Sequence, residues 1–552
     1  MKKVDFPLVR KKRLEDALQE IRRLEEKLSV YKATTRGQKA ALTRMRKKIK
    51  MLRGIVNELS APVVDPPHLL TPAYLGNIVV PQIPCTYTIE KRGSTYYAEP
   101  DKLGFERIYG RNPRTVIQKT IDTLTSGGRI LLKDAVYQID NSILFKGVQN
   151  IVFEGESWNT IIKPTGEFHA ITLGSLQESD LAKNIVIRNL KIDGSNQPTA
   201  TSSPSTDETA FLESGVGIGL SQYAENIVIE NVYLYNTGSD SICGYLNNGP
   251  VLIQGNLIEA CRGYYAAIHP HGGNQKRWVV VGNIIRNCNA LAIRHAGIIA
   301  YNFCEDVGKD PPCGTGDNII YDANAPSIVI GNRVILGEKA SGIRIGSDGS
   351  IAIGNYIYGN GTYQGLVVSK WYSDYIPKNI VIVGNVIENT IAGITVASGR
   401  NVIVANNIVK DSDERGINLL NNPNASEAGK RNLIIGNIIK GVTDYDGIQV
   451  NKETDTSIIG NVIIDANRYG IGGANTTNLL IENNRIISPG SLPINFWGTE
   501  TNLTIRGNKG YDEHSIPTSA PSNPVAGSMY FDTETNTLYV YNGSAWKSVA
   551  LS

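Results

Sequence analysis

Residues 381–387 read VIVGNVI, and close variants of this phrase recur as VIVANNIV at 402–409, LIIGNII at 433–439 and SIIGNVI at 457–463. Each copy places β-branched residues on both sides of an asparagine, often with a glycine just before it. Most successive copies between Asn189 and Asn508 are 22 to 30 residues apart. That period fits two or three short strands joined by turns and is too short for a strand with a crossover helix. The chain is therefore predicted to form a solenoid, in which each period is one coil.

The second half of each period carries another pattern, a glycine followed by alternating aliphatic residues, as in GIRI at 342–345, GITV at 393–396 and GIQV at 447–450. Alternation at every second residue, with glycine at the turn, predicts a strand with one buried face. Stacked coils would align these strands in parallel sheets about 4.8 Å apart. Like residues should then lie above like residues in ladders.

An asparagine anchors each copy of the repeated phrase. An asparagine amide can donate and accept hydrogen bonds at once, so stacked copies can bond to one another and to turn backbone. We therefore interpret these residues as a structural ladder rather than as a binding site. They are Asn189, Asn231, Asn256, Asn283, Asn332, Asn355, Asn385, Asn407, Asn437, Asn461, Asn484 and Asn508.

The first sixty residues have a different pattern, because one heptad register runs unbroken from Leu14 to Leu59. Twelve of its fourteen a and d positions are apolar, the exceptions being Thr35 and Gln38. This register predicts a parallel coiled coil and does not by itself choose between two and three strands. Residues 1–59 hold 18 Lys or Arg against 7 Asp or Glu, and the remainder holds 37 against 45. We interpret the basic stalk as a docking surface for an acidic assembly rather than for nucleic acid.

The stalk is joined to the solenoid by a proline-rich connector at residues 60–81, which cannot continue the helix. Residues 86–99, TYTIEKRGSTYYAE, then predict a hairpin with glycine at its turn. A helical pattern follows and is expected to cap the open apolar end of the solenoid. The inward-facing residues of that helix are Val116, Ile117, Ile121 and Leu124.

Several segments in the first coils resemble a known superfamily. They read VIQKTIDTL at 116–124, GGRILL at 127–132, IVFEGES at 151–157 and IVIRNLKIDG at 185–194. They look like the first coils of the pectate-lyase-like right-handed parallel β-helix superfamily, which viral tailspikes and tail fibres often carry. Residues 521–549 resemble the small β-rich terminal module of many phage and archaeal-virus tail fibres. The resemblance says little about chemistry, because this superfamily includes lyases, hydrolases and proteins that only bind.

The expected fold is mainly β, with a right-handed parallel β-helix at residues 111–512. A coiled-coil stalk at 1–60 and a connector with a hairpin at 61–110 precede it, and a small β module at 513–552 follows it. The resemblance implies a parallel homotrimer that attaches to a virion tail or baseplate component through its stalk and meets a host surface glycan. It also implies a location in the virion tail, after assembly in the host cytoplasm.

The composition of the chain also indicates several features that we do not expect in this protein. No stretch near 18 apolar residues and no hydrophobic signal region at the start are found, so neither membrane insertion nor a signal peptide is expected. Cys261 and Cys288 are expected to stack as reduced thiols in adjacent coils. No cofactor is expected. The acidic runs at 411–416 and 451–457 lack full calcium-ligand spacing, so calcium has no support from them.

A functional face is predicted where the outward residues of the glycine-led strands become cationic. Aligning these strands gives an outward column of Cys243, His269, Arg294, Arg344, Val367, Thr395, Asn418, Gln449 and Gly472. Only its first part is cationic and titratable, and His295 follows Arg294 directly. The candidate site residues are Asp240, His269, His271, Arg294, Arg344 and Asp348.

Two kinds of chemistry remain open for this face. Glycoside hydrolysis needs two carboxyl groups about 5 to 9.5 Å apart, which Asp240 could form with Asp317, Asp322 or Asp348. Uronate elimination needs a base and a cation that neutralises the substrate carboxylate, roles open to the histidines and arginines of the column. Neither set is complete. The same side chains are also compatible with ordinary surface residues of a strand ladder.

The sequence thus favours a virion tailspike or tail-fibre protein that recognises a host surface polysaccharide. It leaves open whether the protein also depolymerises that polysaccharide, as a polysaccharide lyase or a glycoside hydrolase. The alternative is a non-enzymatic structural or adhesive tail fibre, and a remoter one is a cellular surface adhesin.

Overall fold

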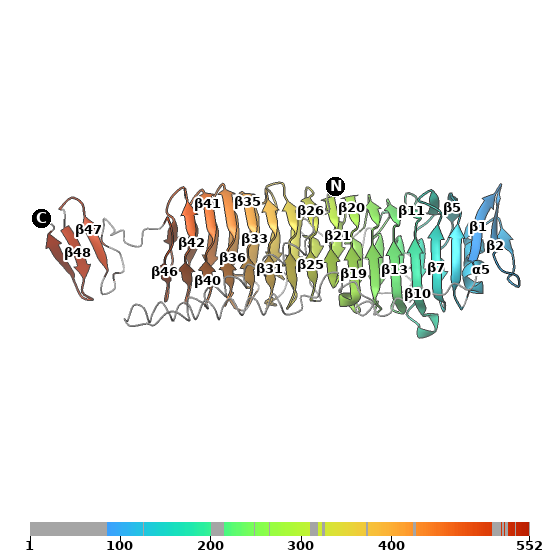
Figure 1. Cartoon of the computed structure of the whole chain (residues 1–552), viewed down its shortest axis with the longest axis horizontal. Helices are drawn as coiled ribbons and strands as arrows, with labels where there is room; N and C mark the ends of the chain where they lie inside the picture. Colours follow the sequence, from blue (N-terminus) through green and yellow to red (C-terminus); the bar gives the residue numbers. More distant parts are fainter. Residues whose placement is uncertain are drawn as a thin grey trace, which may run out of the picture. The chain divides into compact units, whose positions relative to one another are not determined.

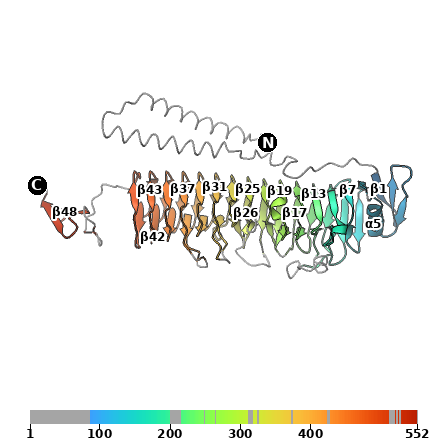
Figure 2. The ribbon, with the colours of Figure 1, turned by 90° about the horizontal axis from the view of Figure 1, so that it is seen from below.

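The computed structural model describes residues 86–550 apart from 125, 200–214, 248, 264, 310–317, 323–325, 371–373, 423, 424, 426, 511–519, 521–523, 525–527 and 536. Within this range the chain forms a solenoid of stacked coils (Figures 1 and 2). The predicted coiled coil at 1–60 and the proline-rich connector lie outside the described residues. No helix in the described part of the chain is long and apolar enough to cross a membrane.

Each full coil contributes one strand to each of three parallel sheets, which we name A, B and C. Sheet A contains β4 (Gly128–Leu132), β7 (Gln149–Gly155), β10 (Ala182–Arg188), β13 (Ala224–Glu230), β16 (Val251–Gln254), β19 (Trp278–Val281), β22 (Ile298–Ala300), β25 (Ile328–Ile330), β28 (Ile351–Ile353), β31 (Val381–Val383), β34 (Ile403–Ala405), β37 (Leu433–Ile435), β40 (Ser457–Ile459), β43 (Leu480–Glu482) and β46 (Thr504–Arg506).

Sheet B contains β5 (Ala135–Ile139), β8 (Thr160–Pro164), β11 (Lys191–Asp193), β14 (Tyr233–Tyr235), β17 (Leu257–Glu259), β20 (Ile284–Cys288), β23 (Phe303–Val307), β26 (Arg333–Leu336), β29 (Tyr356–Tyr358), β32 (Val386–Glu388), β35 (Ile408–Ser412), β38 (Ile438–Val442), β41 (Val462–Ala466) and β44 (Arg485–Ile487).

Sheet C contains β6 (Ile143–Phe145), β9 (Ile171–Leu173), β12 (Ile218–Leu220), β15 (Ile242–Tyr245), β18 (Ala266–His271), β21 (Leu291–Arg294), β24 (Asn318–Tyr321), β27 (Ser341–Ile345), β30 (Leu366–Val368), β33 (Ala392–Ala397), β36 (Arg415–Leu420), β39 (Ile448–Asn451), β42 (Ile471–Ala474) and β45 (Ile494–Phe496). These large parallel sheets are consistent with the expected right-handed β-helix. Inward-facing Ile, Val and Leu from all three sheets form one continuous core.

The asparagine ladder is present and links the coils from Asn256 to Asn508. In its middle, both the backbone N–H and the side-chain Nδ2 of Asn385 donate to Oδ1 of Asn407 at 2.9 Å. Asn385 Nδ2 also donates to the carbonyl of Ala352 at 3.1 Å, and its Oδ1 accepts from both nitrogens of Asn355. Every ladder side chain in this run is buried. The structural interpretation of these asparagines is therefore confirmed.

Two of the predicted anchors lie elsewhere, and one ladder member was missed. Asn189 and Asn231 occupy the left-handed turn position, with φ of 55° and 49°, where other coils place glycine. Their side chains bond to each other at 2.8 Å. Asn302 belongs to the ladder, since it accepts from Asn283 and donates to Asn332. Its flanking sequence, AYNFC, lacks the aliphatic residues that marked the other copies.

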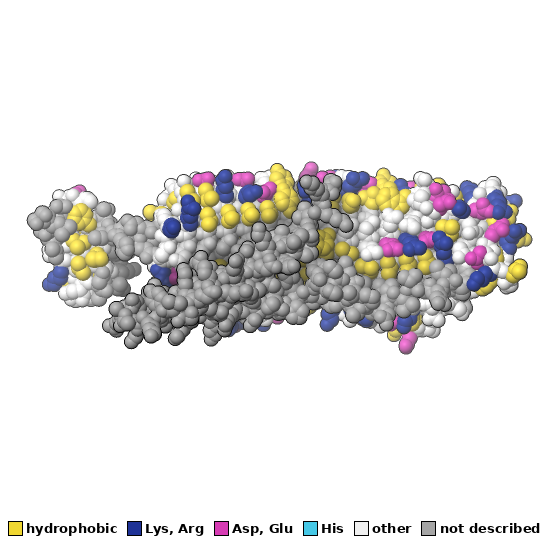
Figure 3. Space-filling view, in the orientation of Figure 1, with side chains coloured by type: hydrophobic (Ala, Val, Ile, Leu, Met, Phe, Trp, Pro, Cys, Tyr) yellow, Lys and Arg dark blue, Asp and Glu magenta, His cyan; other side chains and the backbone are white. Residues whose placement is uncertain are grey.

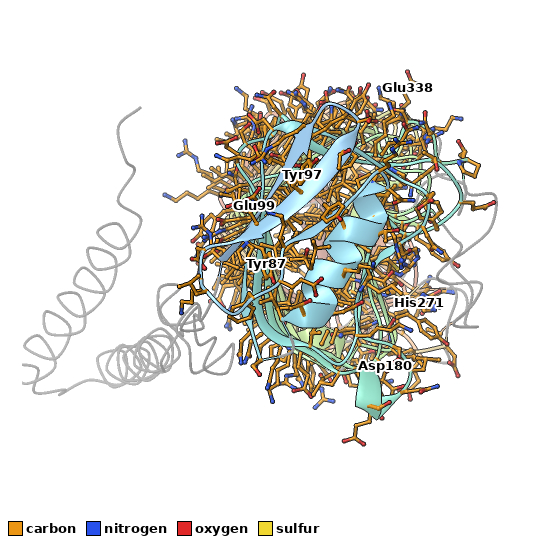
Figure 4. All side chains as sticks on the ribbon, turned by 90° about the vertical axis from the view of Figure 1, so that its right-hand side faces the viewer. Tyr87, Tyr97, Glu99, Asp180, His271 and Glu338 are labelled. Atoms are coloured by element: carbon orange, nitrogen blue, oxygen red, sulfur yellow. The ribbon has the colours of Figure 1, made fainter. Side chains whose placement is uncertain are left out.

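The predicted hairpin and capping helix are both present. Strands β1 (Thr86–Arg92) and β2 (Thr95–Pro100) pair antiparallel, β3 (Ile108–Gly110) pairs with β2, and β1 joins sheet A beside β4. Helix α5 (Pro113–Thr123) begins at Asn112, whose side chain accepts from the N–H of Thr115. In the view along the solenoid, α5 lies across its end (Figure 4). The predicted inward residues of α5 and its C-cap are buried, which excludes water from the first coil.

The C-terminal residues form a small antiparallel sheet of β47 (Met529–Asp532), β48 (Thr537–Tyr541) and β49 (Trp546–Ala550). Its aromatic side chains pack on one another, because Tyr530 stacks on Tyr539 with ring centroids 4.6 Å apart and Trp546 meets Tyr530 edge-on at 4.9 Å. This sheet agrees with the β-rich module expected there. The two short 3-10 helices, η1 (Glu178–Asp180) and η2 (Gln275–Arg277), lie in turns of the solenoid.

Candidate functional site

The register of sheet C confirms the predicted outward column and adds one residue to it. Cys243 on β15 pairs with His269 on β18, and Arg294 on β21 pairs with Tyr321 on β24. Tyr321 in turn pairs with Arg344 on β27. Tyr321 was missed because its strand reads NIIY and lacks the glycine that led the other strands. The column therefore brings His269, Arg294, Tyr321 and Arg344 onto consecutive coils.

Asp240 and His269 form a buried pair at the start of this column. Oδ2 of Asp240 lies 3.0 Å from Nδ1 of His269. The other oxygen of Asp240 accepts from the backbone N–H groups of Tyr265 and Ala266, both at 3.3 Å. Among the described residues, Nε2 of His269 has no hydrogen-bond partner. The carboxylate thus fixes the imidazole and leaves its second nitrogen available.

Burial sets the ionisation of this pair. It raises the pKa of Asp240 to about 7, against the opposing effects of the two backbone N–H groups and of Arg294. Burial also holds the pKa of His269 well below its usual value, with a further lowering by the charges of Arg294 and His271. His269 is therefore neutral at physiological pH. In the tautomer whose Nδ1–H donates to the ionised Asp240, Nε2 carries a lone pair that can accept a proton.

Two arginines and two tyrosines alternate beside the pair. The guanidinium of Arg294 lies between the rings of Tyr265 and Tyr321, at 4.7 and 5.3 Å from their centroids. The guanidinium of Arg344 lies 5.1 Å from the same Tyr321 ring. Cation–π contacts of this kind hold a guanidinium in place while its charge is retained. Arg294, Tyr265 and Tyr321 are partly exposed, so this charge is available at the surface.

Three histidines meet at the same place. The His269 ring lies edge-on to His271 and His295, with centroids 5.2 and 5.6 Å apart. His295 sits in a turn with φ of 64°, and its Nδ1 lies 3.4 Å from Nε2 of Gln275. Burial lowers the pKa of His271 and His295 as well. His271 is only partly buried and lies at the outer edge of the solenoid in the axial view (Figure 4).

The column was expected to be exposed, and that expectation is wrong for every member except Arg294, which is partly exposed. His269 is 1 % exposed and Arg344 is 5 % exposed. Neighbouring aromatic rings contact both side chains, since Tyr265 lies 5.1 Å from the His269 ring and Tyr321 lies against Arg344. The sequence showed which residues point away from the core and could not show what covers them. The accessible part of the site is accordingly Tyr265, His271, Arg294 and Tyr321.

The remaining acidic candidates have structural partners. Asp348 accepts from the backbone N–H of Lys378 at 2.7 Å. Asp322 is buried, accepts from the N–H of Gly346, and receives the Ser347 hydroxyl on its carbonyl at 2.9 Å. Asp317 lies outside the described residues. In the part of the chain that is described, Asp240 is thus joined to an imidazole and not to a second carboxylate.

The buried carboxyl group of Asp322 makes a testable contribution to pH dependence. Burial raises its pKa to about 7, partly offset by a hydrogen bond from Ser350. A carboxyl group whose pKa is raised in the folded state stabilises the protein while it is protonated. This contribution is complete below pH 4 and is lost as pH rises towards 7. The Asp322→Asn variant should therefore gain roughly 3 to 4 kcal/mol on wild type between pH 4 and 8. Melting temperatures measured across that range check this, and a difference that is constant with pH would contradict it.

One group of side chains has the composition of a metal site. Potential ligand atoms of Asp240, Cys243 and His269 all lie within 4.8 Å of one another, and the three residues are buried. The Asp240–His269 hydrogen bond accounts for two of them without a cation. No other group of this kind is found among the described residues.

The acidic run at 451–457 places Glu453 against Asn432 and Thr456, as part of a turn. Cys261 and Cys288 are buried free thiols, as expected.

A second cationic and aromatic cluster lies on later coils and was missed. Arg468 bonds both oxygens of the buried Asp446, at 2.8 and 2.7 Å. Its guanidinium lies 5.0 Å from the Tyr445 ring and 4.8 Å from the Trp497 ring, and both rings are exposed. The outward strand column holds Gln449 on this coil and therefore gave no indication of the cluster. Tyr445 and Arg468 come from the turns before the strands.

Comparisons with known proteins find one family model and several solved structures that are similar to this chain. A family model described as periplasmic copper-binding protein (NosD) matches residues 372–547. No curated protein matches the chain. The A-module of the mannuronan C-5 epimerase AlgE6 of Azotobacter vinelandii is 17 % identical, with 74 % of this chain and 96 % of that chain covered and a TM-score of 0.39.

Two further solved structures are similar to this chain. PfbA, a surface adhesin of Streptococcus pneumoniae, is 12 % identical over 80 % of this chain and 95 % of its own, with a TM-score of 0.37. Tailspike protein 3 of bacteriophage CBA120 is 12 % identical over 82 % of this chain and 68 % of its own, with a TM-score of 0.29.

Proposed function

We propose that this protein binds an acidic polysaccharide on the outer face of sheet C, between β15 and β27. The observation that carries the proposal is the pairing of Arg294 with Tyr321 on neighbouring strands, with Tyr265 on the other side of Arg294 and all three side chains partly exposed. Guanidinium groups suit carboxylate and sulfate ligands, and aromatic faces supply apolar contact area. Coils stacked about 4.8 Å apart repeat such groups at distances that successive sugar units can span.

We further propose that the protein is the host-recognition element of a virion tail fibre or tailspike. The supports are the resemblance of residues 115–193 and 521–549 to such fibres and the heptad register from Leu14 to Leu59. On this proposal the stalk attaches to the tail and the β-helix meets the host surface glycan. Copper binding is left out of the proposal, because residues 372–547 hold no cysteine and one histidine, whereas copper sites use imidazole and sulfur ligands.

A second candidate function, cleavage of the bound polysaccharide by elimination, is favoured by the Asp240–His269 pair. His269 Nε2 would take the proton from C5 of a uronate while Arg294 neutralises the carboxylate that stabilises the resulting carbanion. The C4–O bond then breaks, a C4=C5 double bond forms, and the leaving oxygen takes a proton from water. His269 is covered by Tyr265 and His271, so this reaction requires those rings to move aside.

Incubation with acidic polysaccharides tests both parts. Binding should be measured by affinity electrophoresis, and cleavage by the absorbance of the unsaturated uronates that elimination produces. We expect retardation of the protein by polyuronates that weakens as salt is raised, because the contact is between opposite charges. Retardation without new absorbance would reject cleavage and keep the binding function. Absence of retardation at low salt, with every polyuronate tried, would reject the binding function.

A further inference from the structure

The outward face of sheet A is aliphatic over many consecutive coils. In the six three-residue strands β22, β25, β28, β31, β34 and β37, the middle residue points into the core and is 0 % exposed. The first and third residues of each strand point outward and are Ile, Val, Leu or Ala without exception. We call these twelve residues the sheet A strip. From Ile328 to Ile435 its side chains are half-buried, although they lie outside the core cluster.

The same ladder is charged at both of its ends. Glu154, Arg188 and Glu230 form a chain of ion pairs, with contacts of 2.6 and 3.3 Å. Figure 3 shows this row as alternating acidic and basic side chains over β7, β10 and β13. At the other end Glu482 pairs with Arg506 at 3.1 Å. In the register of sheet A, the aliphatic third residues of the strip lie in the same ladder as Glu230 at one end and Glu482 at the other.

Sheet B shows what this chain places on an outward face that meets water. Its outward face alternates aliphatic residues, among them Ile408, Ile438 and Val462, with ion pairs such as Glu259 with Arg286 and Glu388 with Lys410 at 2.6 Å. The sheet A strip has no charged or polar side chain in any of its twelve positions. Six strands at about 4.8 Å spacing, with two side chains each, present roughly 300 Å² of apolar surface. That is within the range of the largest apolar patches on soluble proteins, which are commonly interfaces.

We propose that the sheet A strip packs against the same strip of parallel copies of this chain. The strip runs along the axis on which the coils stack, so copies aligned in parallel and in register meet along its whole length. The heptad register from Leu14 to Leu59 independently predicts parallel association of copies. Identical β-branched ladders then interdigitate, and the interface adds apolar burial to whatever the stalk contributes.

The test uses the full-length protein with one added thiol. Ile353→Cys places a thiol in the centre of the strip, and Ile438→Cys, on the outward face of sheet B and 42 % exposed, is the matched control. A short bis-maleimide should join two copies through position 353 and give a two-chain band on a denaturing gel. The control and the wild type should give far less of this band. The wild type also measures the background from the six natural cysteines.

Two outcomes would overturn the proposal. One is a two-chain band that is no stronger for Ile353→Cys than for Ile438→Cys, when mass spectrometry shows that both added thiols have reacted with the bis-maleimide. The other is a sedimentation mass of one chain for the wild type, which would mean that the strip is covered by a segment of its own chain or by nothing. A two-chain band specific to position 353, with a mass of more than one chain, is the result that the proposal predicts.

Discussion

Replacing Asn385 by alanine is expected to lower the free energy of unfolding by about 3 to 5 kcal/mol. Asn385 is 0 % exposed and bonds to Asn355, Asn407 and the carbonyl of Ala352. Alanine removes these bonds and leaves buried amide and carbonyl groups unsatisfied in two neighbouring coils. Each unsatisfied buried group costs about 1 to 3 kcal/mol. Urea denaturation followed by circular dichroism measures the loss.

Asn401 provides the matched control, because it belongs to an exposed asparagine pair that joins the coil of Asn385 to the next coil. Its Nδ2 donates to Oδ1 of Asn379 at 2.9 Å, and its φ of 53° is one that glycine adopts freely. Asn401→Gly should therefore cost less than about 1 kcal/mol. Equal losses for Asn385→Ala and Asn401→Gly would show that the buried ladder does not hold the coils together.

Much of this fold is readable from the sequence because a solenoid repeats a local pattern. The period of 22 to 30 residues fixed the coil, and alternation in segments such as VIVGNVI indicated which residues face inward. The hairpin at Thr86–Pro100 and the helix α5 were also predictable, since their signals are local. Asn189 and Asn231 were misassigned because one residue of offset separates the turn position from the ladder position, and both accept asparagine.

The site was harder to predict because it depends on contacts between coils. The outward column gave His269, Arg294 and Arg344, and Asp240 was chosen from its closeness in sequence. The covering of His269 by Tyr265 could not be read from a strand pattern, because Tyr265 precedes its strand. Arg468 and Trp497 were missed for the same reason. Residues from turns have no periodicity that would place them on a face.

Reversing the charge of Arg294 should weaken binding of an acidic polysaccharide by roughly 100-fold, or about 2.7 kcal/mol. Arg294 is the partly exposed arginine of the site, and a glutamate there would repel the ligand carboxylates. Arg333 is the matched control, because its guanidinium also lies between two rings, 5.9 Å from Phe303 and 5.1 Å from Tyr356, but on the face of sheet B. Arg333→Glu should leave the affinity within about two-fold of wild type. Melting temperatures of both variants control for loss of the fold.

Isothermal titration of the full-length protein with polygalacturonate, polymannuronate and hyaluronate, each also in carboxyl-reduced neutral form, tests the central claim most directly. The proposed site predicts that at least one acidic polymer binds and that its neutral form does not. It also predicts that Arg294→Glu weakens this binding roughly 100-fold while Arg333→Glu retains it. Equal affinity for the acidic and neutral forms, or equal losses in the two variants, would contradict the assignment of an acidic-polysaccharide site to the outer face of sheet C.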